Sequence, residues 1–139
     1  MSTTSVSNEI ACERALAAFI QAFDARDTQG ALAQLAPDAV WFRQGQRLEG
    51  HAQIAPVIES RPESRIVRHH LSTIVARLTG ATSARVRAYY AAYAHEGPER
   101  PRLVRGAERV GDYHAELVLL NGEWRISMLR AERLFEVGQ

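Results

Sequence analysis

The feature that most constrains this chain is a change in sequence character at Pro62, after which strand-forming residues dominate. Four long stretches rich in Val, Ile and aromatic residues follow, at 65–78, 84–94, 107–120 and 124–135. Turn signals separate these stretches: Gly80, the Gly- and Pro-containing loop 95–101, and Asn121-Gly122, which is a strong short-range hairpin signal. Consecutive strands joined by short turns predict an antiparallel sheet.

The first part of the chain shows helical spacing instead. From a cap at Ser7 or Asn8, apolar residues recur every three or four positions to about residue 25, which predicts one long amphipathic helix. Asp27-Thr28 is typical of a second cap and predicts a short helix over 29–35, which Pro37 ends.

A strand pair and a third helix complete the region before Pro62. The pair, 39–42 and 47–49, turns at Gly45, and the helix covers 51–60. Helices followed by long antiparallel strands are typical of an α+β fold with helices on one face of the sheet. Because twist accumulates along long strands, we expect a cone-shaped, curved antiparallel sheet whose concave side can hold a small molecule.

Composition limits the classes of function. With 139 residues, 46% hydrophobic and 24% charged, the chain fits one globular domain, expected over 7–136 after a flexible tail at 1–6. Its 17 basic and 16 acidic residues give a formal net charge of +1, so neither nucleic acid nor a membrane is an expected partner.

The sequence also predicts where the protein is found and how its cysteine is used. No apolar run reaches the roughly 18 residues of a membrane span, and the N-terminus lacks a secretory signal, which predicts a cytoplasmic protein. Cys12 is the only cysteine, which excludes an internal disulfide and indicates a packed thiol.

Three stretches carry a family pattern. They are Phe23-Asp24-Ala25-Arg26-Asp27, Arg68-His69-His70-Leu71-Ser72-Thr73, and Gly111-Asp112-Tyr113-His114 through Asn121-Gly122 to Arg130. Together with the order of elements, they resemble the SnoaL-like family of the nuclear transport factor two-like superfold, over about residues 7–135. The resemblance implies a cystatin-like α+β roll. It is nearest to members such as scytalone dehydratase and hexachlorocyclohexane dehydrochlorinase, in a group that also holds bile acid dehydratase and polyketide cyclases.

The resemblance also implies a catalytic pair. The dehydratases and the dehydrochlorinase use an Asp from the first helix and a His from the first long strand, which fall on Asp24 and His70. The spacing to Thr73 fits, whereas Ile74 stands where the dehydrochlorinase has Asn, so the resemblance implies no polar contact there. A histidine, whose pKa ordinarily lies near neutrality, can take a C–H proton, and a buried Asp can fix its tautomer. Such chemistry requires no cofactor and no metal, and we expect neither.

Strand alternation alone leaves open which adjacent histidine faces inward. Neighbouring strand residues point to opposite faces, so one of His69 and His70 faces the interior unless a bulge intervenes. His70 shares its face with the more apolar set: Ser72, Ile74, Ala76 and Leu78. The resemblance, rather than the alternation, selects His70. The alternatives are that Asp24 faces water at the helix end and that the histidine is structural.

Six further residues are candidate substrate contacts: Tyr90, Tyr93, His95, Tyr113, Arg130 and Trp41. Tyr90 shares a face with small alanines that leave room for a ligand, whereas the alternation puts Tyr93 and His95 on the other face. Arg130 shares parity with apolar residues, and a buried arginine needs a carboxylate or a substrate anion. The alternative for each tyrosine is packing with its hydroxyl in water. The histidines lack a metal-site spacing.

Two functions are compatible with these features. The first is a cofactor-independent lyase or isomerase, of dehydratase or cyclase type, acting on a small hydrophobic, cyclic substrate through an Asp-His dyad. The second is a non-catalytic ligand-binding or assembly subunit, like the small subunit of aromatic-ring dioxygenases. In either case we expect a homo-oligomer, a dimer or a trimer, because the outer face of a curved sheet is apolar in places.

Overall fold

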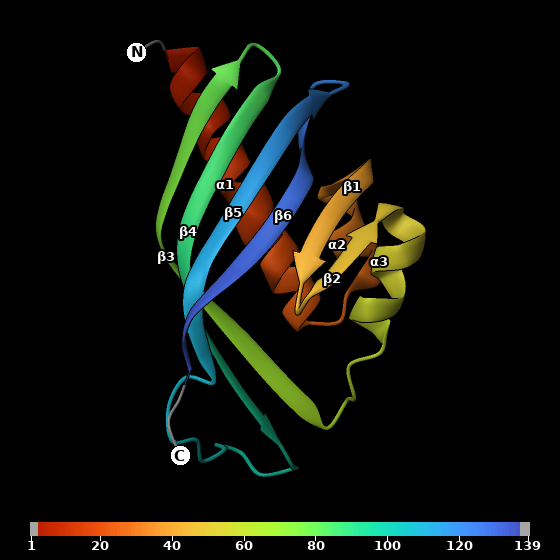
Figure 1. Cartoon of the computed structure of the whole chain (residues 1–139), viewed down its shortest axis with the longest axis vertical. Coiled ribbons are helices and arrows are strands. Elements are labelled where there is room, and N and C mark those ends of the chain that lie inside the picture. The colour runs from red at the N-terminus through yellow and green to blue at the C-terminus, as the bar shows by residue number, and fades with distance from the viewer. Residues whose placement is uncertain (1–2, 137–139) are drawn as a thin grey trace.

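The computed structural model describes residues 3–136, in which helices and strands follow in the expected order. Six strands form one sheet in the order β2-β1-β6-β5-β4-β3. Its long strands are β3 (Arg65–Gly80), β4 (Ser83–Glu96), β5 (Arg109–Leu120) and β6 (Glu123–Glu136), and they curve past α1 (Figure 1). The long strands pair antiparallel, but β1 (Leu35–Arg43) runs parallel to β6 and antiparallel to β2 (Gln46–Glu49), so the sheet is mixed.

Helices supply the other layer of the core. α1 (Thr3–Asp24) packs on β3, β4 and β6. It begins before the expected cap at Ser7, so residues 3–6 are helical and not a tail, while residues 1–2 lie outside the described residues. α2 (Thr28–Ala33) has the expected cap, since Gly30 N–H donates to the Asp27 carboxylate at 3.0 Å. α3 (Gly50–Glu59) packs on β1 and β2.

The core lies between these helices and the concave face of the sheet. Trp41 packs edge-on against Phe19 and Phe23, with ring centroids 5.4 and 5.1 Å apart. Cys12 is fully buried in this core, and burial raises the pKa of its thiol to about 11, as befits a packing residue. None of the helices within residues 3–136 has the length and apolar character needed to cross a bilayer.

Two bulges decide which residues face the concave side. In β3, Ser72 pairs with Tyr89 and Val75 with Arg87, so two residues, Thr73 and Ile74, oppose one on β4. Thr73 has a φ of +51°, an uncommon conformation for a β-branched residue. In β6, Ser127 is the corresponding extra residue, since the pairing shifts between Glu116 and Leu117. Each extra residue reverses the inward and outward positions that follow it.

Candidate functional site

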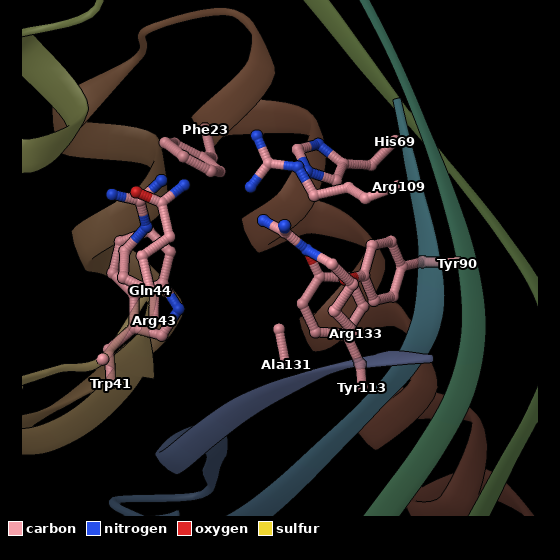
Figure 2. Close-up of a pocket in the computed structure, with 11 residues that line it drawn as sticks. Phe23, Trp41, Arg43, Gln44, His69, Tyr90, Arg109, Tyr113, Ala131 and Arg133 are labelled. Carbon is pink, nitrogen blue, oxygen red and sulfur yellow. The ribbon is translucent and has the colours of Figure 1, made fainter. Parts of the chain in front are cut away.

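A cavity of about 400 Å³ lies between the concave face of the sheet and the turn that joins β1 to β2. Figure 2 shows side chains from both sides converging on it. Four aromatic rings form much of its wall: Phe23, Trp41, Tyr90 and Tyr113. The charged and titratable lining consists of His69 and three arginines, Arg43, Arg109 and Arg133, besides the tyrosine hydroxyls. Most of these residues lie in helices and strands, so the lining is held by the scaffold.

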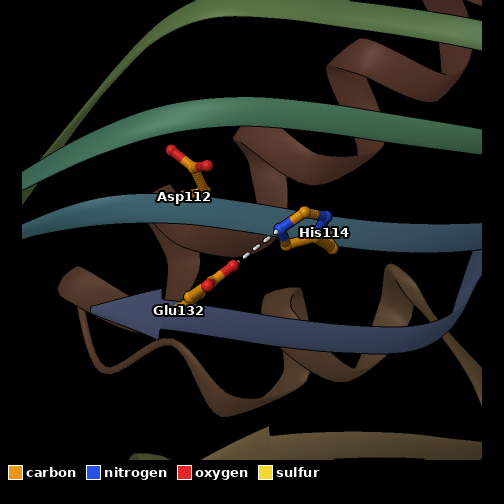
Figure 3. A group of neighbouring side chains, drawn as sticks. All are labelled: Asp112, His114 and Glu132. Atoms are coloured by element: carbon orange, nitrogen blue, oxygen red, sulfur yellow. Dashed lines mark ion pairs between the residues drawn. The ribbon is translucent and has the colours of Figure 1, made fainter. Parts of the chain in front are cut away.

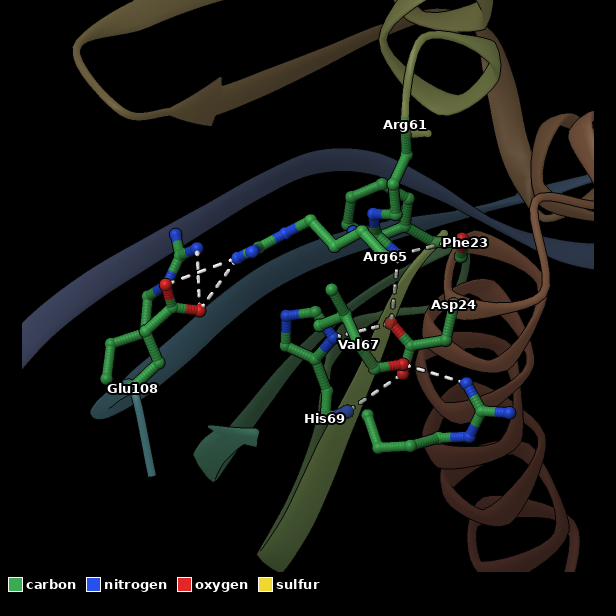
Figure 4. A network of polar contacts seen from close by, with 9 residues as sticks. Phe23, Asp24, Arg61, Arg65, Val67, His69 and Glu108 are labelled. Carbon is green, nitrogen blue, oxygen red and sulfur yellow. Dashed lines mark hydrogen bonds and ion pairs between the residues drawn. The ribbon is translucent and has the colours of Figure 1, made fainter. Parts of the chain in front are cut away.

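Asp24, the last residue of α1, is hydrogen-bonded to His69 on β3 (Figure 4). His69 Nδ1 lies 2.7 Å from Asp24 Oδ1, and the His69 backbone N–H donates to Oδ2 at 2.8 Å. Both side chains are buried, with exposed fractions of 7% for Asp24 and 8% for His69. Because the carboxylate only accepts, Nδ1 carries the proton and Nε2 of the neutral ring keeps its lone pair.

Arg61 completes this network from the segment after α3. Its Nη1 lies 3.6 Å from Asp24 Oδ1, and its guanidinium lies over the Phe23 ring, 4.2 Å from the centroid. Burial lowers the pKa of Arg61, and Asp24 partly opposes that shift. Asp24 therefore faces the protein interior and not water at the helix end.

The expected pairing of Asp24 with His70 is wrong, because His70 lies on the opposite face of β3. It is exposed, and its ring packs edge-on against Tyr93 at 5.3 Å. The bulge at Thr73 explains why the alternation did not exclude His70: inward positions are Val67, His69 and Leu71 before the bulge, and Ile74, Ala76 and Leu78 after it. His70 shares parity with the second set but lies before the extra residue.

Tyr90 and Tyr113 face the cavity from adjacent strands. Their ring centroids are 4.5 Å apart, and the His69 ring lies 6.2 Å from Tyr90 and 6.3 Å from Tyr113. Burial raises the pKa of both hydroxyls, so both stay protonated at neutral pH. Among residues 3–136, neither hydroxyl has a hydrogen-bond partner, which leaves both to donate to a bound molecule.

The sequence matches a known family. A family model described as a SnoaL-like domain matches residues 4–130, most of the chain. The chain belongs to the SnoaL-like family. No curated protein matches its sequence.

Several solved structures resemble this one closely in shape and distantly in sequence. A provisionally named scytalone dehydratase from Novosphingobium aromaticivorans has a TM-score of 0.83 at 20% identity, over 99% of this chain and 91% of that one. A type 3 hexachlorocyclohexane dehydrochlorinase from Novosphingobium barchaimii has a TM-score of 0.79 at 14% identity, over 95% of this chain and 90% of that one. A provisionally named aromatic ring hydroxylase from Novosphingobium aromaticivorans has a TM-score of 0.74 at 20% identity, over 94% of this chain and 91% of that one.

The other residues expected at the site of this SnoaL-like protein divide between the two faces. Trp41 lies on the cavity wall. Tyr93 and His95 continue the outward alternation of β4 and are exposed. Arg130 is also exposed, because the extra residue Ser127 ends the parity that it shared with Trp124 and Ile126. Tyr93, His95 and Arg130 therefore do not line the cavity, contrary to expectation.

Sequence reasoning missed the arginines of the cavity. Arg43 alternates with Trp41, and Arg109 lies four positions before Tyr113, so alternation from these aromatic residues indicates both. Arg133 is harder to find, because the bulge at Ser127 that turns Arg130 outward also turns Arg133 inward. Burial lowers the pKa of Arg43, and the positive charges of Arg109 and Arg61 lower it further.

A cluster of metal-ligand type lies elsewhere, on the outer face of β5 and β6 (Figure 3). One ligand atom each of Asp112, His114 and Glu132 lies within 4.8 Å of the others. His114 Nε2 is 3.4 Å from Glu132 Oε2, the geometry of a partly exposed ion pair. In the cavity, the only described lining residue of metal-ligand type is His69, whose Nδ1 already bonds Asp24.

Proposed function

We propose that this chain is a cofactor-independent lyase or isomerase that moves a proton at a carbon atom of a small cyclic substrate. The observation that carries the proposal is the 2.7 Å bond between Asp24 Oδ1 and His69 Nδ1, next to a cavity that His69 lines. The fold likeness to proteins named as a dehydratase and a dehydrochlorinase supports the same class of chemistry.

In this mechanism His69 is the base and Asp24 is its positioning residue. Nε2 takes the proton of a C–H bond, and the negative charge of Asp24 stabilises the resulting imidazolium. In an elimination, the C–H electron pair forms a C=C bond as the group on the neighbouring carbon departs, and His69 returns the proton to it. In an isomerisation, the electron pair passes to an adjacent carbonyl oxygen and gives an enolate conjugated with a C=C bond. The carbonyl re-forms as the far carbon of that C=C bond takes the proton back from His69 and the double bond shifts.

Tyr90 and Tyr113 would stabilise the charge that develops on oxygen. Both hydroxyls stay protonated because burial raises their pKa, so each can donate to an enolate oxygen. Their rings lie close to that of His69, which suits a substrate whose acidic carbon and carbonyl group are adjacent. Neither step requires an oxidant or a reductant.

The binding or assembly subunit remains the second function that the sequence allows. Burial of a carboxylate–histidine pair costs desolvation free energy. A subunit that catalyses no reaction would have no use for such a pair at the wall of a cavity. The buried pair therefore favours catalysis.

Deuterium exchange tests the proposal before the natural substrate is known. The protein is incubated in D₂O with a panel of cyclic ketones and β-hydroxy ketones, each with and without a carboxylate or phosphate group on the ring, and NMR follows deuterium incorporation or loss of water. We expect turnover of at least one compound, loss of turnover in His69→Ala and Asp24→Asn, and wild-type turnover in His70→Ala. Equal turnover in His69→Ala would contradict the proposal, and binding without turnover would favour the subunit.

A further inference from the structure

The cavity is strongly cationic although the chain as a whole is nearly neutral. The net charge of the chain is +1, yet three of the 11 described residues that line the cavity are arginines. None of these 11 residues is an aspartate or a glutamate. Asp24 lies beside the cavity, but both of its oxygens are engaged by His69, and Arg61 lies 3.6 Å from one of them. The chain itself therefore supplies little counter-charge for these guanidinium groups.

None of the three cavity arginines forms a close ion pair with a buried carboxylate among the residues that the structure describes. Arg43 has no hydrogen bond or ion pair with any residue in the part of the chain that the structure describes, and it lies over the Trp41 ring at 5.2 Å. Arg109 approaches Glu108 only at 3.9 Å, and that carboxylate already accepts two bonds from Arg65, at 3.2 and 2.9 Å. Arg133 pairs with Glu136, which is largely exposed.

This arrangement is unfavourable without an anion. A partly buried guanidinium loses hydration, and a structural arginine usually recovers it by facing a carboxylate. Here the neighbours are other cations: burial lowers the pKa of Arg43, and Arg109 and Arg61 lower it further. An oxyanion that enters the cavity would gain charge-assisted hydrogen bonds and would relieve the repulsion among the arginines.

We infer that the substrate carries an oxyanionic group, carboxylate or phosphate, on a planar ring, and that Arg43, Arg109 and Arg133 bind that group. Figure 2 shows Arg43 on one side of the cavity and Arg109 and Arg133 on the other, so the anion would bridge β1 to β5 and β6. The aromatic walls would pack on the ring and leave His69 with the two tyrosines for the reacting carbon. The inference rests on the proposed function in taking this cavity as the substrate site.

Calorimetric titration with three ring-matched probes tests the inference: 2-naphthoate, 2-naphthyl phosphate and the neutral 2-naphthamide. We expect at least one anion to bind about tenfold or more tightly than the amide at low salt, since a hydrogen bond to a charged group contributes this much. The two anions distinguish carboxylate from phosphate. Arg43→Gln and Arg109→Gln should each reduce the preference for the anion, while affinity for the amide stays the same.

Arg130→Gln is the matched control, because it removes the same charge from the outer face of the sheet. It should keep the wild-type preference. Melting curves check folding, and neither cavity variant should melt below wild type, because each removes a cation that its neighbours repel. Weak or absent binding of both anions relative to the amide would overturn the inference, as would an unchanged preference in the Arg43→Gln/Arg109→Gln double variant.

The same samples separate this inference from the proposed function. His69→Ala should keep the preference for the anion and lose deuterium exchange. If exchange depends on His69 but no anion is preferred, only the oxyanion inference fails. If an anion binds through the arginines and the panel shows no exchange, the proposed reaction fails and the cavity is an anion-binding site.

Discussion

The two faces of the long-stranded sheet carry the same residue types in different surroundings. His69, Tyr90 and Arg133 line the cavity on the inner face. His70, Tyr93 and Arg130 lie one to three positions away on the same strands, and all are exposed on the outer face. Residue type therefore does not identify the site in this protein, whereas the side of the strand does. The outer residues also give each inner residue a control in the same strand.

The largest expected difference between the faces is between the two histidines. His69→Ala should lower the rate of carbon-proton exchange by about 10²–10⁴-fold, because a positioned general base contributes this much. His70→Ala should stay within about twofold of wild type, since surface residues remote from a site have small effects. Exchange kinetics in D₂O compare the two, and equal losses would remove the distinction between the faces.

Asp24→Asn should lower the same rate by about 10²-fold or more, because a neutral amide neither selects the Nδ1–H tautomer nor stabilises the imidazolium. It should also lower the free energy of unfolding by about 1–3 kcal/mol, since the bonds to His69 and the contact with Arg61 are buried. Asp38→Asn, an exposed carboxylate on β1, is the control for both measurements. A stable, fully active Asp24→Asn protein would rule out the dyad.

Gly111→Ala tests the close approach of β5 and β6 that supports the inner face. A Cβ at Gly111 would lie 1.9 Å from the backbone oxygen of Glu132, so a backbone shift is needed. We expect urea denaturation to show a loss of about 1–3 kcal/mol, the usual result of overpacking. Gly106→Ala, where no atom lies within 4 Å of the added Cβ, should change stability little. Similar values for the two variants would mean that the strands can separate freely here.

Tyr90→Phe compares the tyrosines on the two faces of β4. Loss of one of two hydroxyls at the cavity should lower the exchange rate about tenfold, the value of a hydrogen bond of about 1.4 kcal/mol. Tyr93→Phe, on the outer face, should leave the rate unchanged. If both variants behave like wild type, Tyr113 alone would have to serve as the donor, and Tyr113→Phe would then show the loss.

The smallest expected effect concerns the β3 bulge at Thr73, which follows the two histidines. Thr73→Asn should raise the free energy of unfolding by about 0.5–1 kcal/mol, because Asn adopts a positive φ more readily than a β-branched residue. Ser72→Asn, at the neighbouring exposed position, should give no gain. Thermal denaturation of both variants checks this, and a loss of stability in Thr73→Asn would mean that the threonine side chain itself stabilises the bulge.

Sequence alone could predict the order and type of the elements because their boundaries carry explicit chemical signals. Asp27 caps α2 as expected, and Asn121-Gly122 lies between β5 and β6. The start of α1 is not predictable in the same way, because residues 3–6, which precede the expected cap at Ser7, are helical without showing apolar helical spacing.

The face of the sheet on which a site residue lies could be predicted only where its strand has no bulge. Alternation along β4 indicates Tyr90 for the inner face, and the structure places it there. Alternation left the choice between His69 and His70 open and failed for Arg130, because nothing in the sequence marks Thr73 or Ser127 as an extra residue. A bulge arises from pairing with a neighbouring strand, so its position depends on tertiary context.

The parallel pairing of β1 with β6 has a consequence for how the chain acquires its cavity. β1 brings Trp41 and Arg43 to the wall opposite β6, and the register joins Phe42 to Arg130, far along the chain. Contacts between such distant segments are slow to form, because a long loop must close first. A nascent chain that ends before β6 lacks Ala131 and Arg133, so the wall of the cavity is incomplete until β6 is in place. A ligand held in this cavity would therefore report on the docking of β6 beside β1.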